Sequence, residues 1–358
     1  MQTSVFPTSL SSFTPTAVAM RGRRLALRLA LAAGLLAPLA GWSASATDTA
    51  AAANAPRKSV KLLTIGNSFS NNAISQLPQL AEAGGKELLL GRTSLGGCSL
   101  ERHAKHLAAA LKDPESAEGR PYTNNPAVFG KALAGRKTVS LPEALAAQEW
   151  DFVTIQEWSA RSFKPEFQEP YAKQLIEAIR KYAPTAEILI HETWAYREDH
   201  SWYQKGDELT QQKMYDGLHA AYRELSARYG GLRIIPSGSA IQAARQTPRW
   251  TYKVDPNFDF KNPPEGQLPD QTGSLNVGWT WRKKDGTQKF GLDAIHVNAA
   301  GCYLGGCAFY ETIYNDSVPP ATAYAPKGMS VEDAAQLREI AHQAVQAERQ
   351  RERTLAKR

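Results

Sequence analysis

Residues 62–70 read LLTIGNSFS, and this stretch decides the fold. A short continuous apolar run is typical of a parallel strand that is buried on both faces. Gly66 follows the run and allows a tight turn into a helix. Ser68 would then stand at the carboxyl edge of the sheet, where open α/β folds build their sites. Ser68 is therefore a candidate nucleophile, and the alternative is that it caps the N-terminus of the helix.

Apolar strands alternate with helical stretches along the rest of the chain. We predict strands at residues 60–65, 88–94, 152–156, 187–192 and 233–236. We predict helices at residues 73–86, 100–111, 141–148, 171–182, 210–229 and 299–314. This alternation implies right-handed crossovers between parallel strands, with helices on both faces of the sheet. The expected architecture is a three-layer α/β/α sandwich with a five-stranded parallel sheet.

The N-terminal residues 1–46 have the pattern of a secretory signal peptide. Four arginines precede an apolar run at residues 29–39, and Ala44-Ser45-Ala46 fits the small-x-small cleavage pattern. We therefore predict an exported protein, periplasmic or extracellular. The further predicted parts are a linker at 47–57, one α/β domain at 58–329 with insertions at about 113–140 and 245–291, and a charged helix at 330–358.

Charge argues against a nucleic-acid partner. The whole chain carries 42 Lys+Arg and 35 Asp+Glu, a net charge of +7. The leader holds four arginines and no acids, so its removal leaves 38 against 35, a net charge of +3. Nucleic-acid binding needs a basic face rather than a slight excess of this kind. No stretch after the leader reaches the roughly 20 apolar residues of a membrane span, and the sequence does not indicate an oligomeric state.

Cysteine and histidine positions indicate neither a disulfide framework nor a metal site. Three cysteines, Cys98, Cys302 and Cys307, are too few and too scattered for a disulfide scaffold, so we expect buried free thiols. His103 and His106 are spaced for one helix face, but the sequence shows no set of carboxylate or cysteine partners for them, which is more often the pattern of surface histidines. We expect no metal and no cofactor.

A serine hydroxyl needs a base and a group that orients the base. Asp293 and His296 supply both: on a turn ahead of a helix, the carboxylate can accept the imidazole Nδ1–H and leave Nε2 facing the nucleophile. The alternative is that His296 is an ordinary histidine at a helix start and Asp293 a turn residue.

An oxyanion needs donors, and three candidates follow successive predicted strands. These are the backbone N–H of Ser68, the N–H of Gly97 and the side-chain amide of Gln156. Gly97 could equally belong to a plain turn, and Gln156 could be a strand-end amide bonded within the fold. Their joint occurrence with the Asp-x-x-His pair favours a site.

At these residues the chain resembles the SGNH/GDSL hydrolase superfamily. Four blocks carry the resemblance in the family's order: Gly66-Asn67-Ser68-Phe69-Ser70, Gly96-Gly97, Ile155-Gln156-Glu157 and Asp293-Ala294-Ile295-His296. The resemblance spans residues 60–314. It implies a flavodoxin-like sheet and a metal-independent serine esterase, with Ser68 as nucleophile, His296 as base and Asp293 as its orienter.

Two positions depart from the family pattern. The usual Gly-Asp-Ser block has Asn67 in its middle, which leaves the nucleophile intact. The third block normally carries an asparagine that donates to the oxyanion, and Gln156 stands there instead, as in carbohydrate-esterase-like branches. Ser159 is the alternative donor.

The sequence-based hypothesis is a secreted esterase that removes O-acyl groups, chiefly O-acetyl groups, from carbohydrate. Trp158, Trp279 and Trp281 are candidate substrate-binding residues, because flat aromatic rings suit the faces of sugars; packing within a loop is their alternative role. Two other hypotheses stay open: a general short-chain, lipid or thioester hydrolase, and a non-catalytic carbohydrate-binding domain on the same fold.

Overall fold

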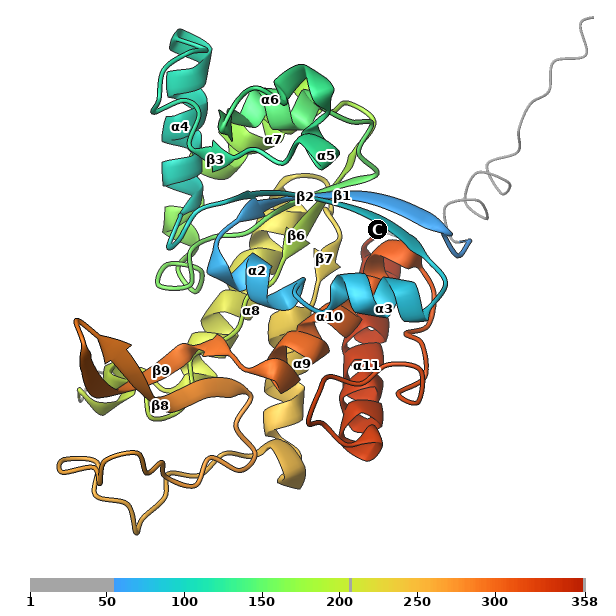
Figure 1. Cartoon of the computed structure of the whole chain (residues 1–358). Coiled ribbons are helices and arrows are strands. Elements are labelled where there is room, and N and C mark those ends of the chain that lie inside the picture. The colour runs from blue at the N-terminus through green and yellow to red at the C-terminus, as the bar shows by residue number, and fades with distance from the viewer. Residues whose placement is uncertain (1–54, 206–207, 357–358) are drawn as a thin grey trace, which may run out of the picture. The chain divides into compact units, whose positions relative to one another are not determined.

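A parallel sheet of five strands forms the centre of the protein (Figure 1). The computed structural model describes residues 55–205 and 208–356. The strand order is β2-β1-β5-β6-β7, with every neighbouring pair parallel. The strands are β1 (Ser59–Gly66), β2 (Glu87–Ser94), β5 (Phe152–Ile155), β6 (Glu187–His191) and β7 (Ile234–Ile235). The predicted fold class, a three-layer α/β sandwich with five parallel strands in flavodoxin-like order, is confirmed.

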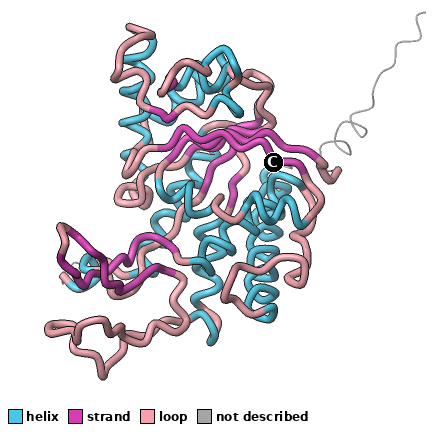
Figure 2. The backbone as a smooth tube through the Cα atoms, in the orientation of Figure 1, coloured by secondary structure: helices cyan, strands magenta, loops and turns pink. Residues whose placement is uncertain are grey.

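Helices cover both faces of this sheet, as Figures 1 and 2 show. On one face, α4 (Leu100–Lys112), α6 (Leu141–Ala146) and α7 (Tyr171–Tyr182) pack against one another. On the other face lie α2 (Ser68–Ala73), α3 (Leu77–Ala83), α9 (Ser237–Arg245), α10 (Ala299–Tyr314) and α11 (Val331–Ala356). Helix α8 (Gln211–Arg228) packs against β7 and α9.

Helix α10 lies at the centre of the second layer, and its residues from Ala300 to Tyr314 are all buried. A helix that is apolar all round belongs in a core. Two glycines let it approach its neighbours closely: a Cβ on Gly305 would lie 3.1 Å from the Cα of Ala73, and one on Gly306 would lie 3.1 Å from a methyl of Leu80. This close contact fixes α2, the helix that begins at Ser68, against the rest of the layer.

The predicted helix at 73–86 is confirmed only over α3, residues 77–83, because the chain turns after Ala73. Helix α2 begins earlier, at Ser68, and ends at Ala73; α3 begins at Leu77 after a turn. Pro78 lies in the first turn of α3, where its missing N–H costs no hydrogen bond. The insertion at 113–140 holds short elements that its sequence did not indicate: β3 (Tyr122–Thr123), α5 (Pro126–Phe129) and β4 (Thr138–Val139).

The insertion at 245–291 contains a strand that the sequence analysis missed. Strand β8 (Asn276–Lys284) pairs with β9 (Thr287–Val297) in an antiparallel hairpin. Asp285 and Gly286 form its turn, both with positive φ, as the turns favoured in tight hairpins require. Asp293 and His296 therefore lie on strand β9, and the prediction that they lie on a turn is wrong. Four short 3₁₀ helices complete the described elements: Lys131–Leu133, Pro165–Phe167, Ser201–Gln204 and Pro248–Trp250.

The C-terminal helix α11 lies within the predicted 330–358 helix. One face, with Ala334, Leu337 and Ala341, is buried against α9 and α10. Its polar side is bonded to α8 through Arg223, whose guanidinium contacts both Glu348 of α11 and Glu192, the residue after β6. The helix is thus part of the fold rather than a solvated tail.

Cys98, Cys302 and Cys307 are buried free thiols, as predicted. Among the described residues, no helix is long and apolar enough to cross a membrane. The predicted signal peptide at 1–46 and residues 47–54 of the predicted linker lie outside the described residues.

Candidate active site

Ser68 is the first residue of α2, directly beyond the carboxyl end of β1. Asn67 caps the helix, since its Oδ1 accepts the backbone N–H of Phe69 at 2.9 Å. The alternative that Ser68 itself is the cap is therefore wrong. Gly66 must be glycine, because a Cβ there would collide with the hydroxyl of Ser70. The corner leaves the Ser68 side chain partly exposed while its neighbours Asn67 and Phe69 are buried.

The structure brings Ser68, His296 and Asp293 into one hydrogen-bonded chain. Ser68 Oγ lies 2.8 Å from His296 Nε2. His296 Nδ1 lies 3.1 Å from each carboxylate oxygen of Asp293. With Nδ1–H donating to Asp293, Nε2 accepts the serine hydroxyl, which is the arrangement that can remove the proton of Ser68.

Asp293 is held in its charged form. Burial opposes ionisation, but hydrogen bonds from the His296 ring and backbone, together with the Arg282 guanidinium, leave its pKa well below its usual range. Its Oδ1 also lies 3.3 Å from the backbone nitrogen of Ile295. An ionised carboxylate fixes the tautomer of His296 and stabilises the imidazolium that forms during proton transfer.

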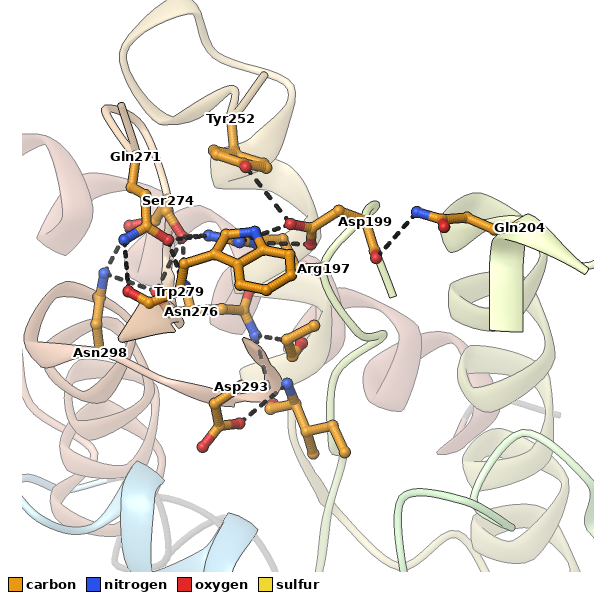
Figure 3. Close-up of polar contacts among 12 residues, drawn as sticks. Arg197, Asp199, Gln204, Tyr252, Gln271, Ser274, Asn276, Trp279, Asp293 and Asn298 are labelled. Carbon is orange, nitrogen blue, oxygen red and sulfur yellow. Dashed lines mark hydrogen bonds and ion pairs between the residues drawn. The ribbon is translucent and has the colours of Figure 1, made fainter. Parts of the chain in front are cut away.

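Side chains from the loop after β6 hold the hairpin that carries Asp293 and His296 (Figure 3). Arg197 is buried, makes two hydrogen bonds to Asp199, and donates its backbone N–H to Ala294 O at 2.8 Å. Asn276 of β8 donates its amide to the same Ala294 carbonyl at 3.1 Å. Trp194 donates its indole N–H to Ile295 O at 3.0 Å, and its ring stacks on Phe69. The base is thus positioned by contacts to the backbone of the two residues that precede it.

Two backbone donors remain available beside the serine. Within residues 55–205 and 208–356, the N–H groups of Ser68 and Gly97 have no hydrogen-bond acceptor. Gly97 takes a positive φ of 58°, which favours glycine. Asn67 ties this turn to the corner, because its Nδ2 donates to the carbonyl of Cys98 at 2.9 Å. These two N–H groups can serve as an oxyanion hole.

Gln156 is engaged within the fold. Its Oε1 accepts the backbone N–H and the hydroxyl of Ser70 at 3.0 and 2.9 Å. Its Nε2 donates to the carbonyl of Glu157 at 2.8 Å. Ser159 is buried and bonded to the hydroxyl of Tyr196. Neither side chain shows a contact with Ser68, so an oxyanion role for Gln156 or Ser159 stays a prediction.

Glu157 is a fully buried carboxyl group beneath these loops. Its Oε1 accepts the backbone N–H groups of Leu100 and Trp158, at 3.2 and 2.5 Å. Burial raises the pKa of Glu157 to about 7, because desolvation outweighs the two hydrogen bonds. The group therefore ties the start of α4, just after the Gly97 turn, to the loop after β5.

The three predicted aromatic residues lie in two places. Trp158 is 37% exposed and lies over the Gly97 turn, where a Cβ on Gly97 would be 3.8 Å from its indole nitrogen. Trp279 stacks on Phe290 and lines a cavity of about 550 Å³ together with Asp293. Trp281 also contacts Phe290 and donates its indole N–H to a loop carbonyl, that of Gln267. Trp158 is thus the one of the three beside the oxyanion turn, while Trp281 packs within the hairpin.

His103 is buried, so its assignment to the surface is wrong. Its ring nitrogens bond to the Tyr122 hydroxyl at 2.8 Å and the Gly66 carbonyl at 3.0 Å. His106 bonds to the carbonyl of Glu118. No cluster of three or more metal-ligating side chains occurs in the part of the chain that the structure describes. His103 instead supports the end of β1.

Comparison with known families identifies a match over most of the fold. The model of the DUF4886 family, described as a domain of unknown function, matches residues 61–262. The protein belongs to the DUF4886 family. A crystal structure of a DUF4886 protein from Bacteroides uniformis ATCC 8492 is 27% identical with a TM-score of 0.59, covering 80% of this chain and 95% of that one. No curated protein matches the sequence.

Other solved structures are more distant. One, assigned as a GDSL-like lipase from Parabacteroides merdae ATCC 43184, is 12% identical with a TM-score of 0.39 and covers 73% of this chain and 98% of that one. Another, assigned as an arylesterase from Agrobacterium tumefaciens C58, is 16% identical with a TM-score of 0.33 and covers 71% and 98%. Structures assigned to GDSL-type hydrolases are thus among those similar to this DUF4886 protein, and the carbohydrate-esterase branch stays a prediction.

Sequence reasoning missed the residues that hold the triad. Trp194 lies three residues after the end of β6, and the rule that sites form at carboxyl ends of parallel strands could have indicated it. Arg197, Asn276 and Arg282 carried no signal of their own, because their roles depend on the unpredicted pairing of β8 with β9.

Proposed function

We propose that the protein is an exported serine esterase that hydrolyses O-acyl esters, chiefly O-acetyl groups on carbohydrate, through an acyl-enzyme at Ser68. The observation that carries this proposal is the hydrogen-bonded chain from Ser68 Oγ to His296 Nε2 at 2.8 Å and from His296 Nδ1 to Asp293 at 3.1 Å. A serine becomes a nucleophile when a positioned base takes its proton and a third group orients that base.

In the proposed reaction, Ser68 Oγ attacks the ester carbonyl while its proton passes to His296 Nε2. The N–H groups of Ser68 and Gly97 donate to the resulting oxyanion. His296 then gives the proton to the leaving alcohol, which leaves the acyl group on Ser68. A water molecule, deprotonated by His296, attacks the acyl-enzyme, and the acid is released with Ser68 reprotonated. Asp293 stays ionised throughout, as its lowered pKa requires.

Two observations support a carbohydrate as the alcohol. Trp158 is exposed beside the oxyanion turn, where an aromatic face can stack on a sugar. Trp279 and Phe260 line the cavity that also borders Asp293. Export rests on the leader pattern of residues 1–46 and suits an enzyme whose substrates are extracellular polysaccharides.

The esterase activity is tested with p-nitrophenyl acetate. We expect turnover by the wild-type protein and a loss of at least about 10⁴-fold in kcat for Ser68→Ala and for His296→Ala. Ser317→Ala, at an exposed serine, is the matched control and should keep full activity. A fluorophosphonate should add one adduct, which mass spectrometry maps to Ser68. Activity that survives Ser68→Ala would disprove the proposed mechanism, and no turnover of any ester would favour a non-catalytic binding domain.

The carbohydrate assignment is tested separately, by acetate release from acetylated xylan, pectin, sialic acid and peptidoglycan fragments. We expect release from at least one, abolished in Ser68→Ala. Retained activity on p-nitrophenyl acetate without acetate release from any of them would leave a general esterase.

A further inference from the structure

A second cavity, of about 490 Å³, lies along the free edge of β2. Leu90, Arg92 and Ser94 form its base, since alternate residues of a strand share one face. Asn71 of α2 bounds one side, and Asn125 and Phe129 of the 113–140 insertion bound another. Its volume is within the range of ligand-binding cavities.

This cavity adjoins Ser68. Asn71 follows Ser68 by three residues in α2, so their side chains lie on one helix face about 5–6 Å apart at Cβ. Ser94 pairs with Gly66 at the end of the parallel ladder, two residues before the nucleophile. Asn71 Nδ2 donates to Ser94 Oγ at 3.0 Å and closes the gap between the helix and the strand. A ligand bound here is therefore next to the reacting serine.

Among the residues that the structure describes, Arg92 is the only charged one that lines this cavity. Its guanidinium has no hydrogen bond or ion pair with any residue in 55–205 or 208–356, whereas two arginines of the neighbouring insertion are paired, Arg120 with Glu143 and Arg136 with Glu115. Arg92 is exposed at this cavity. An exposed guanidinium without a protein partner is free to pair with an anion from outside.

We propose that this cavity binds the alcohol portion of the ester and that Arg92 pairs with a carboxylate on it, so that the substrate is an O-acylated acidic sugar. The inference rests on the proposed esterase function. An acetyl group is far too small to fill the cavity, so we assign the cavity to the sugar ring that carries the acyl group, and further units of the saccharide to Trp158 and the cavity beside Asp293. The apolar side chains of Leu90 and Phe129 suit the C–H face of a sugar ring, while Arg92 offers the forked donors that match a carboxylate.

The test compares two substrates that differ only at C6: monoacetylated methyl glucuronide, which carries a carboxylate, and monoacetylated methyl glucoside, which carries CH₂OH. We expect the wild type to prefer the glucuronide in kcat/KM. In Arg92→Gln this preference should fall by about 10- to 100-fold, the range for a lost charge-assisted hydrogen bond. Arg92→Lys should fall in between, and Arg180→Gln, at an exposed position of α7, should keep the wild-type preference. An unchanged preference in Arg92→Gln would overturn the inference.

Binding gives a readout that does not depend on turnover. Methyl glucuronide should bind to the Ser68→Ala protein in calorimetric titration, and the double variant with Arg92→Gln should bind it at least about tenfold more weakly. If the wild type hydrolyses no ester at all, the esterase proposal fails while this titration still tests Arg92. If esters are hydrolysed but Arg92→Gln affects p-nitrophenyl hemisuccinate and not the glucuronide, the carboxylate belongs on the acyl side and the assignment to the alcohol is wrong.

Discussion

The two halves of the candidate triad are held in different ways. Ser68 is fixed by the local backbone, because β1 ends at Gly66 and Asn67 caps the helix that Ser68 begins. His296 lies on a hairpin outside the central sheet and is held by side chains far away in the sequence. The proposed nucleophile thus depends on a short segment with little freedom, and the proposed base depends on a buried polar network.

The network behind the base is dense. Arg197 bonds to Gln271 and Ser274 as well as to Asp199, and Gln271 in turn pairs with the backbone of Trp279 through both ends of its amide (Figure 3). Buried polar groups stabilise a structure only when all are bonded, so the loss of one member leaves the others unsatisfied. Substitutions in the network around Arg197 should move the base, whereas substitutions at the corner around Ser68 should alter the nucleophile or its oxyanion hole.

Among the variants that test this difference between corner and hairpin, Asp293→Asn should have the largest effect on kcat. The amide would favour the wrong tautomer of His296, and kcat on p-nitrophenyl acetate should fall by about 10⁴-fold with little change in folding. Circular dichroism and the midpoint of urea unfolding check the fold. A kcat within tenfold of wild type would show that Asp293 does not orient the base.

Arg197→Met tests the network itself. It leaves Asp199 buried without its partner, which should lower the free energy of unfolding by about 3–5 kcal/mol. We also expect a loss of kcat, because the guanidinium also bonds Gln271 and Ser274, which support the hairpin that carries the base. Urea denaturation measures the first effect.

The matched control is the double variant Arg197→Met with Asp199→Leu, which removes both charges and should recover part of the stability. If the single variant is as stable as wild type, the hairpin is held by its backbone contacts alone.

The same contrast explains what the sequence could predict. The corner at Ser68 could be predicted because the strand, the glycine and the serine follow one another within nine residues. Asp293 and His296 could be predicted as a pair from their Asp-x-x-His spacing. The hairpin could not be predicted, because the sequence of β8 mixes Trp and Thr with Arg and Lys and so shows no clear alternation of apolar and polar residues. Its one available signal was Asp285-Gly286, a dipeptide typical of tight hairpin turns.

Side-chain contacts between distant segments could not be predicted for a different reason: they depend on how the helices and strands pack. Gln156 could be placed at a strand end, but its bonds to Ser70 depend on the packing of α2 against β5. In the same way, burial of His103 follows from Tyr122, whose strand β3 has only two residues and no periodicity to detect.

Glu157 provides a pH test of the corner side. Folding raises its pKa from the ordinary 4.5 to about 7, so the folded protein favours the protonated form. The contribution to stability is therefore complete below about pH 4.5 and is lost as the pH rises through 7, by at most about 3 kcal/mol.

The measurement is urea unfolding of wild type and Glu157→Gln from pH 5 to pH 8.5. Glutamine cannot ionise, so the difference between the two should shift in favour of the variant as the pH rises. A difference that is constant over this range would mean that Glu157 stays in one protonation state.

Asn67→Asp should have the smallest effect, and it separates two roles of one side chain. An aspartate keeps the oxygen that caps α2 through the N–H of Phe69, but it cannot donate to the carbonyl of Cys98. The Gly97 turn would lose its tie to the corner, and we expect kcat to fall about tenfold with KM nearly constant, which corresponds to about 1.4 kcal/mol in the transition state. Asn67→Ser also keeps a capping oxygen and removes the amide that donates to Cys98, so it should match Asn67→Asp if the tie matters. Wild-type kcat in both variants would show that the turn holds its place unaided, and that the corner, unlike the hairpin, is fixed by its main chain alone.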